Sequence, residues 1–83
     1  MKVFTLEIKP QAFKDLSKVP KPDQKKILQK ISKLESGVTG DVKKLTKFNP
    51  EYRLRVGNYR ILFDIDEDQI IIYRILHRKD AYQ

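Results

Sequence analysis

Hydrophobic and polar residues alternate along the last third of the chain in the manner of β-strands. Alternation runs through 52–56 (YRLRV) and 59–65 (YRILFDI), and an apolar run follows at 69–76 (QIIIYRIL). A period of two indicates half-buried strands, whereas a continuous apolar run indicates a strand shielded on both faces. Gly57-Asn58 and the acidic residues 66–68 separate these segments, and both are typical of hairpin turns. This part of the chain is therefore predicted to form three successive antiparallel strands.

The first half of the chain carries one strand pattern and two helical patterns. Residues 3–8 (VFTLEI) are rich in β-branched and aromatic residues, and Pro10 is expected to end this strand. A short helix is predicted between Pro10 and Pro20, and a longer one after Pro22, with Asp23 as its cap. Core positions expected on these helices are Phe13, Leu16, Ile27, Leu28, Ile31 and Leu34, with Ala12 and Val19 as further candidates.

The connection between the helical and the strand-rich halves is predicted to be a loop. Residues 37–50 mix Gly, Thr, Asn and Pro with three lysines, and leave room for a short strand or turn around Leu45 and Phe48. The element order is then β-α-α-β-β-β in one domain spanning 1–83. Two short amphipathic helices can cover only one face of a sheet, so we predict an α+β fold with an antiparallel sheet and both helices on one face.

Composition narrows the possible chemistry. The chain has 83 residues, no cysteine and one histidine. This excludes disulfides, thiolate zinc sites, iron–sulfur clusters and a His-only metal site, so neither a metal nor a cofactor is expected. No apolar run approaches the length of a membrane span and no secretion signal is evident, which favours a cytoplasmic protein that does not bind a membrane.

The charge of the chain points to a polyanionic partner. Eighteen Lys and Arg against eleven Asp and Glu give a net charge of +7 and a pI of about 9.7. Positive charge is densest in residues 43–60, where Lys43, Lys44 and Lys47 precede three arginines and only Glu51 is acidic. All five arginines follow position 50, and a planar guanidinium suits bidentate phosphate contact better than an ammonium group does.

The hairpin register decides which face these arginines share. If Gly57-Asn58 is the whole turn, Arg55 lies opposite Arg60, and Arg53 lies opposite Leu62. Arg53, Arg55 and Arg60 then occupy one face, while the apolar residues of the hairpin occupy the other. Like charges that face each other across strands destabilise the fold, so their presence in a small domain indicates a function, and phosphate binding is the one that fits guanidinium groups. The structural alternative is that the arginines protect an exposed sheet from aggregation.

The register of the last strand stays open. A two-residue turn at Glu67-Asp68 places Ile71, Tyr73 and Ile75 on the arginine face, whereas a turn of odd length places Ile70, Ile72 and Arg74 there. A central position for this strand would bring its end beside the hairpin. His77 is then an acid/base candidate next to Arg78, and Tyr82 offers a ring for base stacking.

The residues 52–63 (YRLRVGNYRILF) and 71–82 (IIYRILHRKDAY) resemble the RelE/ParE toxin superfamily of type II toxin–antitoxin modules. The resemblance extends over the whole chain. In the RelE branch it implies an endoribonuclease that cleaves mRNA in the ribosomal A site without a metal. The ribose 2′-hydroxyl attacks the adjacent phosphate and leaves a 2′,3′-cyclic phosphate. The resemblance also implies a cognate antitoxin in a hetero-oligomer, with operator DNA bound through the antitoxin.

The resemblance implies a role for each site residue. Arg60 matches the arginine that holds the phosphate, Arg78 the arginine near the leaving oxygen, and Tyr82 the tyrosine that stacks on a base. Arg53 and Arg55 match basic positions before the hairpin, and His77 falls where a histidine or lysine occurs. Arg53 and the preceding lysines Lys43, Lys44 and Lys47 are expected to bind the RNA. The studied branch has a lysine at the position of Arg55 as a candidate base. A guanidinium scarcely accepts a proton at neutral pH, so the base is expected to be His77, the ribosome or solvent.

Two further functions fit the same residues. A ParE-like inhibitor of DNA gyrase would use this scaffold without nuclease chemistry, and a plain RNA- or ribosome-binding domain would use only its charge. The resemblance implies that ParE-type members tend to lose the catalytic set, whereas Arg55, Arg60, Arg78 and Tyr82 are all present here, which favours the endonuclease over the gyrase inhibitor.

Overall fold

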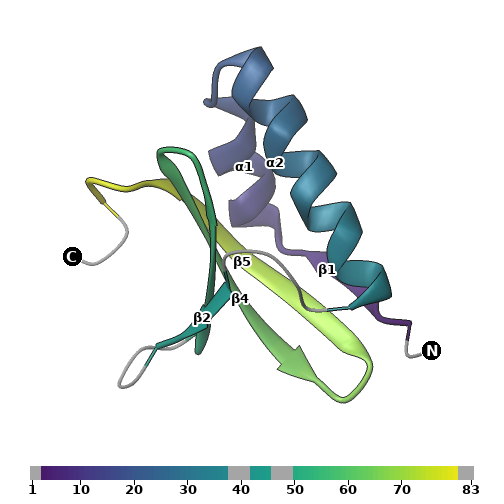
Figure 1. The fold of residues 1–83 in the computed structure, drawn as a ribbon. Coiled ribbons are helices and arrows are strands. Elements are labelled where there is room, and N and C mark those ends of the chain that lie inside the picture. The colour runs from purple at the N-terminus through teal and green to yellow at the C-terminus, as the bar shows by residue number, and fades with distance from the viewer. Residues whose placement is uncertain (1–2, 38–41, 46–49, 81–83) are drawn as a thin grey trace.

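The computed structural model describes residues 3–37, 42–45 and 50–80, which fold into two layers. Two helices form one layer and a five-stranded sheet forms the other (Figure 1). In chain order the elements are β1 (Thr5–Ile8), α1 (Pro10–Ser17), α2 (Lys21–Lys33), a 3₁₀ turn (Leu34–Ser36), β2 (Val42–Lys44), β3 (Tyr52–Val56), β4 (Tyr59–Asp66) and β5 (Gln69–His77). The predicted α+β class is confirmed, with both helices on one side of the sheet.

The sheet is mixed, so the prediction of a wholly antiparallel sheet was wrong in one pairing. Its order is β1-β5-β4-β3-β2, and β1 pairs with β5 in parallel while every other pair is antiparallel. After β1 the chain crosses one face through the two helices, and the following strands meander back until β5 lies beside β1. β2 is a fifth strand of three residues within the segment predicted as a loop, and it pairs with β3. Phe48 lies outside the described residues.

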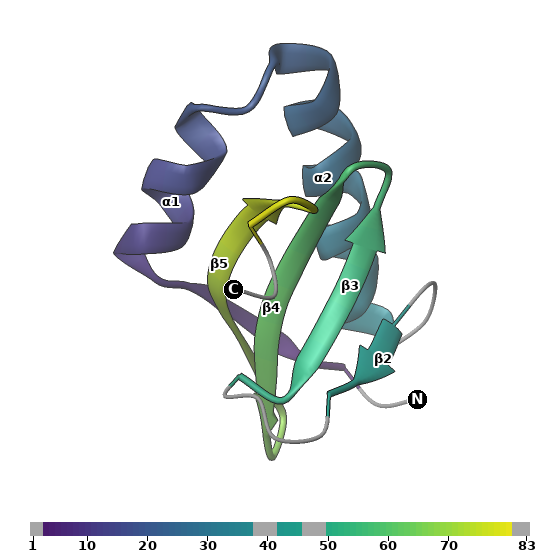
Figure 2. The same cartoon turned by 90° about the vertical axis from the view of Figure 1, so that its left-hand side faces the viewer.

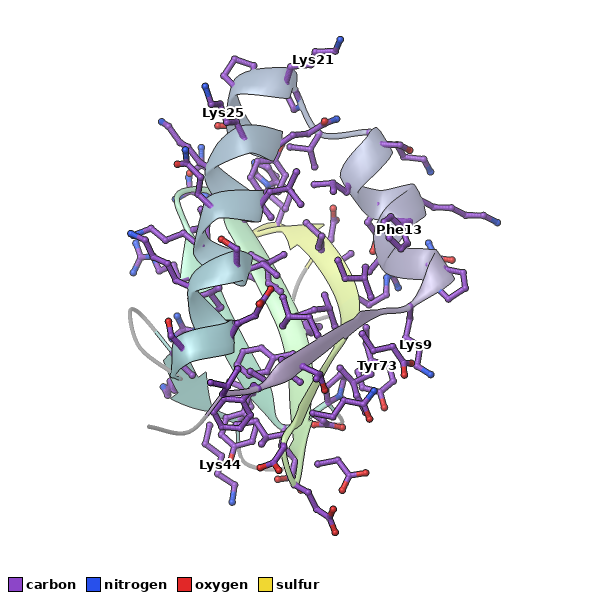
Figure 3. The ribbon with its side chains drawn as sticks, turned by 90° about the vertical axis from the view of Figure 1, so that its right-hand side faces the viewer. Lys9, Phe13, Lys21, Lys25, Lys44 and Tyr73 are labelled. Atoms are coloured by element: carbon purple, nitrogen blue, oxygen red, sulfur yellow. The ribbon has the colours of Figure 1, made fainter. Side chains whose placement is uncertain are left out.

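Each helix buries a narrower stripe than the sequence pattern indicated. Along α1, Ala12 and Leu16 are buried, as is Val19 just after it, but Phe13 is 57% exposed and points away from the sheet (Figure 3). Leu28 of α2 is likewise 44% exposed. Both residues were expected in the core, but each lies beside the buried row, about 100° further around its helix. None of the described helices is long and apolar enough to cross a membrane.

The starts of the helices are defined by proline. Pro10 is the first residue of α1, where its fixed backbone angle and missing N–H are tolerated. α2 begins at Lys21, so Asp23 lies inside its first turn and not at the cap position that the sequence suggested. Lys21 and Lys25 project from the outer side of α2 (Figure 3). The lysine-rich side of this helix is thus solvated.

The core lies between the helices and one face of the sheet. Its fully buried large side chains are Phe63, Ile27, Ile31, Leu34, Leu54, Ile61, Ile70 and Ile72. No described helix covers the opposite face, which we call the open face; Figure 2 shows it with β3 and β4 in front of the helices. Apolar burial therefore stabilises one side of the sheet and leaves the other available for a partner.

A β-bulge in β5 resolves the register that the sequence left open. Glu67 and Asp68 form a two-residue turn, and Asp66 pairs with Gln69. The pairing then shifts by one residue: Phe63 lies opposite Ile72, but Leu62 lies opposite Arg74, so Tyr73 is the extra residue of β5. Ile71 and Tyr73 follow the open-face alternation, as one alternative predicted. Beyond the bulge the alternation is reversed, and the expected open-face residue Ile75 is buried in the core.

Candidate nucleic-acid interface

The hairpin of β3 and β4 has the predicted register. Gly57 has φ +57°, a conformation that favours glycine, and it closes the turn with Asn58. Arg55 lies opposite Arg60, and Arg53 lies opposite Leu62. The neighbouring pairs, Leu54 with Ile61 and Val56 with Tyr59, belong to the core side. The three arginines of the hairpin are therefore on the open face.

The guanidinium group of Arg60 is held over the hairpin turn. Its Nη1 donates hydrogen bonds to the backbone oxygens of Gly57 and Tyr59, each at 3.0 Å. Arg60 is half-buried, whereas Arg55 is exposed. Backbone carbonyl oxygens orient a guanidinium group without neutralising its charge, so the positive charge of Arg60 is still available to an anion.

Arg78 joins this group from the end of β5. Its backbone N–H donates to the carbonyl oxygen of Asn58 at 2.7 Å, which ties the residue directly to the hairpin turn. The β4–β5 ladder pairs Tyr59 with His77 and Arg60 with Leu76, so position 78 follows on the face of Leu76 and Arg60. Residues 78–80 form a turn at the end of β5, in which the N–H of Asp80 donates to the carbonyl oxygen of His77 at 2.8 Å (Figure 1). We call Arg55, Arg60 and Arg78 the arginine cluster.

His77 belongs to the other side of the sheet. It pairs with Tyr59, and the two rings meet edge-on with centroids 5.4 Å apart. Its Nδ1 accepts a hydrogen bond from the backbone N–H of Lys79 at 3.3 Å. His77 also lines a shallow hollow of about 230 Å³ that includes Lys18 and Asp80. The structure thus brings the predicted arginines together but places His77 apart from them, because the bulge reverses the alternation before it.

The predicted RNA-binding residues of the 43–53 segment divide between the two faces. Lys43 pairs with Arg53 and lies on the open face, at the β2 edge. Lys44 pairs with Tyr52 on the helix side, and its Nζ lies 3.9 Å from Oε2 of Glu51. Lys47 and the predicted stacking residue Tyr82 lie outside the described residues.

The open face is electrostatically polarised, which the sequence analysis did not anticipate. At the end opposite the hairpin turn, Asp64 and Asp66 share the alternation of Arg60, and the N–H of Glu51 donates to Oδ1 of Asp64 at 2.6 Å. These three residues, with Ile71 and Tyr73, line a hollow of about 300 Å³. The sequence does contain this change of charge: the even-numbered positions from 60 to 66 are Arg, Leu, Asp and Asp. A polyanion is attracted to the arginine end and repelled from the acidic one.

Between these ends the open face has an apolar floor. Leu62, paired with Arg53 and Arg74, is buried although no described helix covers it, and Leu76, paired with Arg60, is half-buried. Apolar side chains among guanidinium groups provide contact area for the flat surfaces of bases. Within the part of the chain that the structure describes, no cluster of three or more His, Cys, Asp or Glu side chains could hold a metal ion.

Arg74, the remaining arginine of this region, is occupied by an internal ion pair. Its Nε and Nη2 donate to the two carboxylate oxygens of Asp15 at 2.7 and 3.2 Å, and the N–H of Ile75 donates to the same carboxylate at 3.0 Å. Burial of Asp15 raises its pKa, but these hydrogen bonds and one from Gln11 outweigh burial and leave the pKa below its ordinary value. Arg74 therefore joins α1 to β5 and is not a member of the arginine cluster.

Comparison with known proteins identifies the family. Residues 6–82 match the family described as ParE toxin of type II toxin-antitoxin system, parDE. Toxin RelE3 of Methanocaldococcus jannaschii is 39% identical over 74 residues, which cover 83% of this chain and 84% of that protein. The chain therefore belongs to the RelE/ParE superfamily of type II toxin–antitoxin toxins.

Solved structures agree with this assignment. The toxin in the RelB-RelE antitoxin-toxin complex from Methanococcus jannaschii has a TM-score of 0.77 and 35% identity, over 90% of this chain and 93% of that one. A chain of the archaeal RelE-RelB complex from Pyrococcus horikoshii OT3 has a TM-score of 0.78 and 26% identity, over 95% and 99%. The predicted superfamily is thereby confirmed for both sequence and fold.

Proposed function

We propose that this protein is a ribosome-dependent endoribonuclease that cleaves mRNA in the A site. The observation that supports this most strongly is the cross-strand pair of Arg55 and Arg60 on the face that the helices leave open, with the backbone of Arg78 bonded to the same hairpin turn. The guanidinium group of Arg60, oriented by two backbone oxygens, together with the neighbouring Arg55 and Arg78, would form a preorganised receptor for one phosphodiester. Lys43 and Arg53 extend positive charge toward the β2 edge, where the neighbouring nucleotides would lie.

The reaction we propose depends mainly on stabilising the negative charge that develops on the phosphate in the transition state. The ribose 2′-oxygen forms a bond to the adjacent phosphorus, and the bond from phosphorus to the 5′-oxygen of the next nucleotide breaks. The 2′-hydroxyl loses a proton, the 5′-oxygen gains one, and a 2′,3′-cyclic phosphate remains. In the transition state the phosphorane carries an additional negative charge. Arg55 and Arg60 would stabilise its non-bridging oxygens, and Arg78 the leaving 5′-oxygen.

Proton transfer is the step to which the side chains of this protein contribute least. The pKa of a guanidinium group is too high for Arg55 to act as a base at neutral pH. The imidazole of His77 is packed against Tyr59 on the helix side. We therefore assign the base to the ribosome or solvent. Tyr82 follows the turn that ends β5, and we propose that its ring stacks on a base of the codon.

The partner we propose is a cognate antitoxin. The similar archaeal toxins are in complexes of RelE with RelB. A surface with a net charge of +7 attracts an acidic, partly disordered chain, which would fold as it covers the toxin and would carry any binding to operator DNA. Because its substrate is mRNA on a translating ribosome, the toxin would act in the cytoplasm.

Reconstituted cleavage on programmed ribosomes tests the proposal. We expect codon-phased breaks in the mRNA when the A site is vacant, and none when a tRNA occupies it. Arg60→Ala should strongly reduce the breaks, whereas Lys25→Ala, which removes an exposed charge of α2, should leave them unchanged. Wild-type breaks in the Arg60 variant would contradict the role of the arginine cluster.

A second function is favoured by the family description itself, which is that of a ParE toxin. A gyrase inhibitor would block DNA supercoiling in a purified assay and leave ribosome-bound mRNA intact. A domain that only binds RNA would block translation with intact mRNA and would not affect supercoiling. Running both assays on the same preparation therefore separates the three functions.

A further inference from the structure

The bulge in β5 determines which residues of its C-terminal end reach the open face. Up to Ile72 the register with β4 is constant, and from Arg74 onward it is shifted by one residue. Without the shift, Tyr73 would lie opposite Leu62, and His77 would lie opposite Asn58 on the open face. The observed shift instead places Arg78 beside Asn58 and turns His77 toward the helix side. Because of the one extra residue, Arg78 takes the place beside Asn58 that His77 would have in a regular ladder.

The bulge is held from the helix layer by Asp15 of α1. The carboxylate accepts hydrogen bonds from the side chain of Arg74 and from the N–H of Ile75, the two residues that directly follow the extra residue Tyr73. The side chain of Asp15 is 9% exposed and that of Arg74 is 41% exposed, so the carboxylate end of the ion pair is shielded from water. In a regular ladder Arg74 would lie opposite Ile61, which is fully buried, and its charge would enter the core. The ion pair therefore stabilises the bulged register against the regular one.

We propose that Asp15 and Arg74 are positioning residues for the phosphate site. By fixing the bulge, they place Arg78 where it can contact the same phosphate as Arg60. The inference rests on the proposed function of the open face, but its physical content is a register that can be measured without catalysis. Bulges near functional sites commonly re-aim a side chain in this way. Neither residue touches the substrate, and neither belongs to the arginine cluster.

The test uses NMR of the full chain together with the cleavage assay. In the wild type we expect cross-strand contacts between Leu62 and Arg74. We then add a short RNA that lacks the 2′-hydroxyl at the scissile position and so cannot be cleaved, and we expect the amide resonances of Arg60 and Arg78 to shift together over the titration. In Asp15→Asn, the Leu62–Arg74 contact should be lost and Arg78 should cease to respond, while Arg60 still shifts. On ribosomes we expect kcat to fall about 10- to 100-fold with KM within about twofold, because the phosphate is bound but misaligned.

Two further variants make the test decisive. Arg74→Lys retains the positive charge but not the paired hydrogen bonds, and it gives the same readout if Asp15→Asn does not fold. Gln11→Ala removes the exposed bond from Gln11 to Asp15 and should behave as the wild type. The inference would be overturned if the contact between Leu62 and position 74 were retained in both Asp15→Asn and Arg74→Lys. It would also be overturned if the amide of Arg78 still shifted when RNA is added to these variants. A wild type that shows the NMR pattern but never cleaves mRNA would refute the proposed function and leave the positioning role intact.

Discussion

Replacing Arg55 by glutamine should make the protein more stable and less active. Arg55 and Arg60 are direct cross-strand partners, with Cα atoms about 4.5–5.5 Å apart in such a pair. A like-charged pair in this position costs about 0.2–1 kcal/mol. For a domain of this size, relief of that cost raises Tm by about 1–8 °C. Glutamine keeps a polar side chain of similar length, so the change isolates the charge.

Thermal unfolding at low and high salt, with a matched control, tests this reasoning. Lys44→Gln also removes one positive charge, but Lys44 lies beside an opposite charge, with its Nζ 3.9 Å from Oε2 of Glu51. If net charge alone opposed folding, both variants would be stabilised equally; we expect the gain only for Arg55→Gln. The gain should shrink at about 1 M salt, where the screening length is about 3 Å. A lower Tm for Arg55→Gln, or a gain that salt does not reduce, would refute the repulsion argument.

Three further changes test other parts of the structure. Arg60→Ala should lower ribosomal cleavage by about 10²- to 10³-fold, as removal of one preorganised donor does in other enzymes, and circular dichroism should show an unchanged fold. Because the pKa of Asp15 is lowered in the folded state, its contribution to stability is present above about pH 4 and is lost as pH falls through the lowered value; acid titration of Asp15→Asn should lack this component. Gly57→Ala should cost about 1 kcal/mol in urea unfolding, since φ is +57° and, among the described residues apart from the two chain neighbours, no atom lies within 4 Å of the added methyl group, so backbone strain is the main contribution. An unaltered midpoint for that variant would mean that the turn adopts another conformation in solution.

The hairpin could be predicted residue by residue because its determinants are local. A two-residue turn fixes every later pair by arithmetic, and strict alternation then assigns Arg53, Arg55 and Arg60 to one face. The bulge could not be predicted, because it depends on Asp15, which is 59 residues from Arg74 in the chain and approaches only when α1 packs on β5. The faces of the helices were misjudged for a related reason: Phe13 and Leu28 fit helical periodicity, but the sheet accepts only one narrow row from each helix.

The energetics of the two faces explain how the fold tolerates a repulsive site. On the core side, Leu54 and Ile61 lie directly beneath the arginines of the hairpin and are buried to 1% and 0% exposure. Burial of each such side chain contributes about 1.5–3 kcal/mol, which exceeds the cost of the Arg55–Arg60 pair several-fold. The same two strands therefore gain stability on one face and concentrate positive charge on the other. A loop with no buried face would have no comparable gain to offset the repulsion, which is why we expect the phosphate site on the hairpin strands and not on the lysine-bearing connection that precedes them.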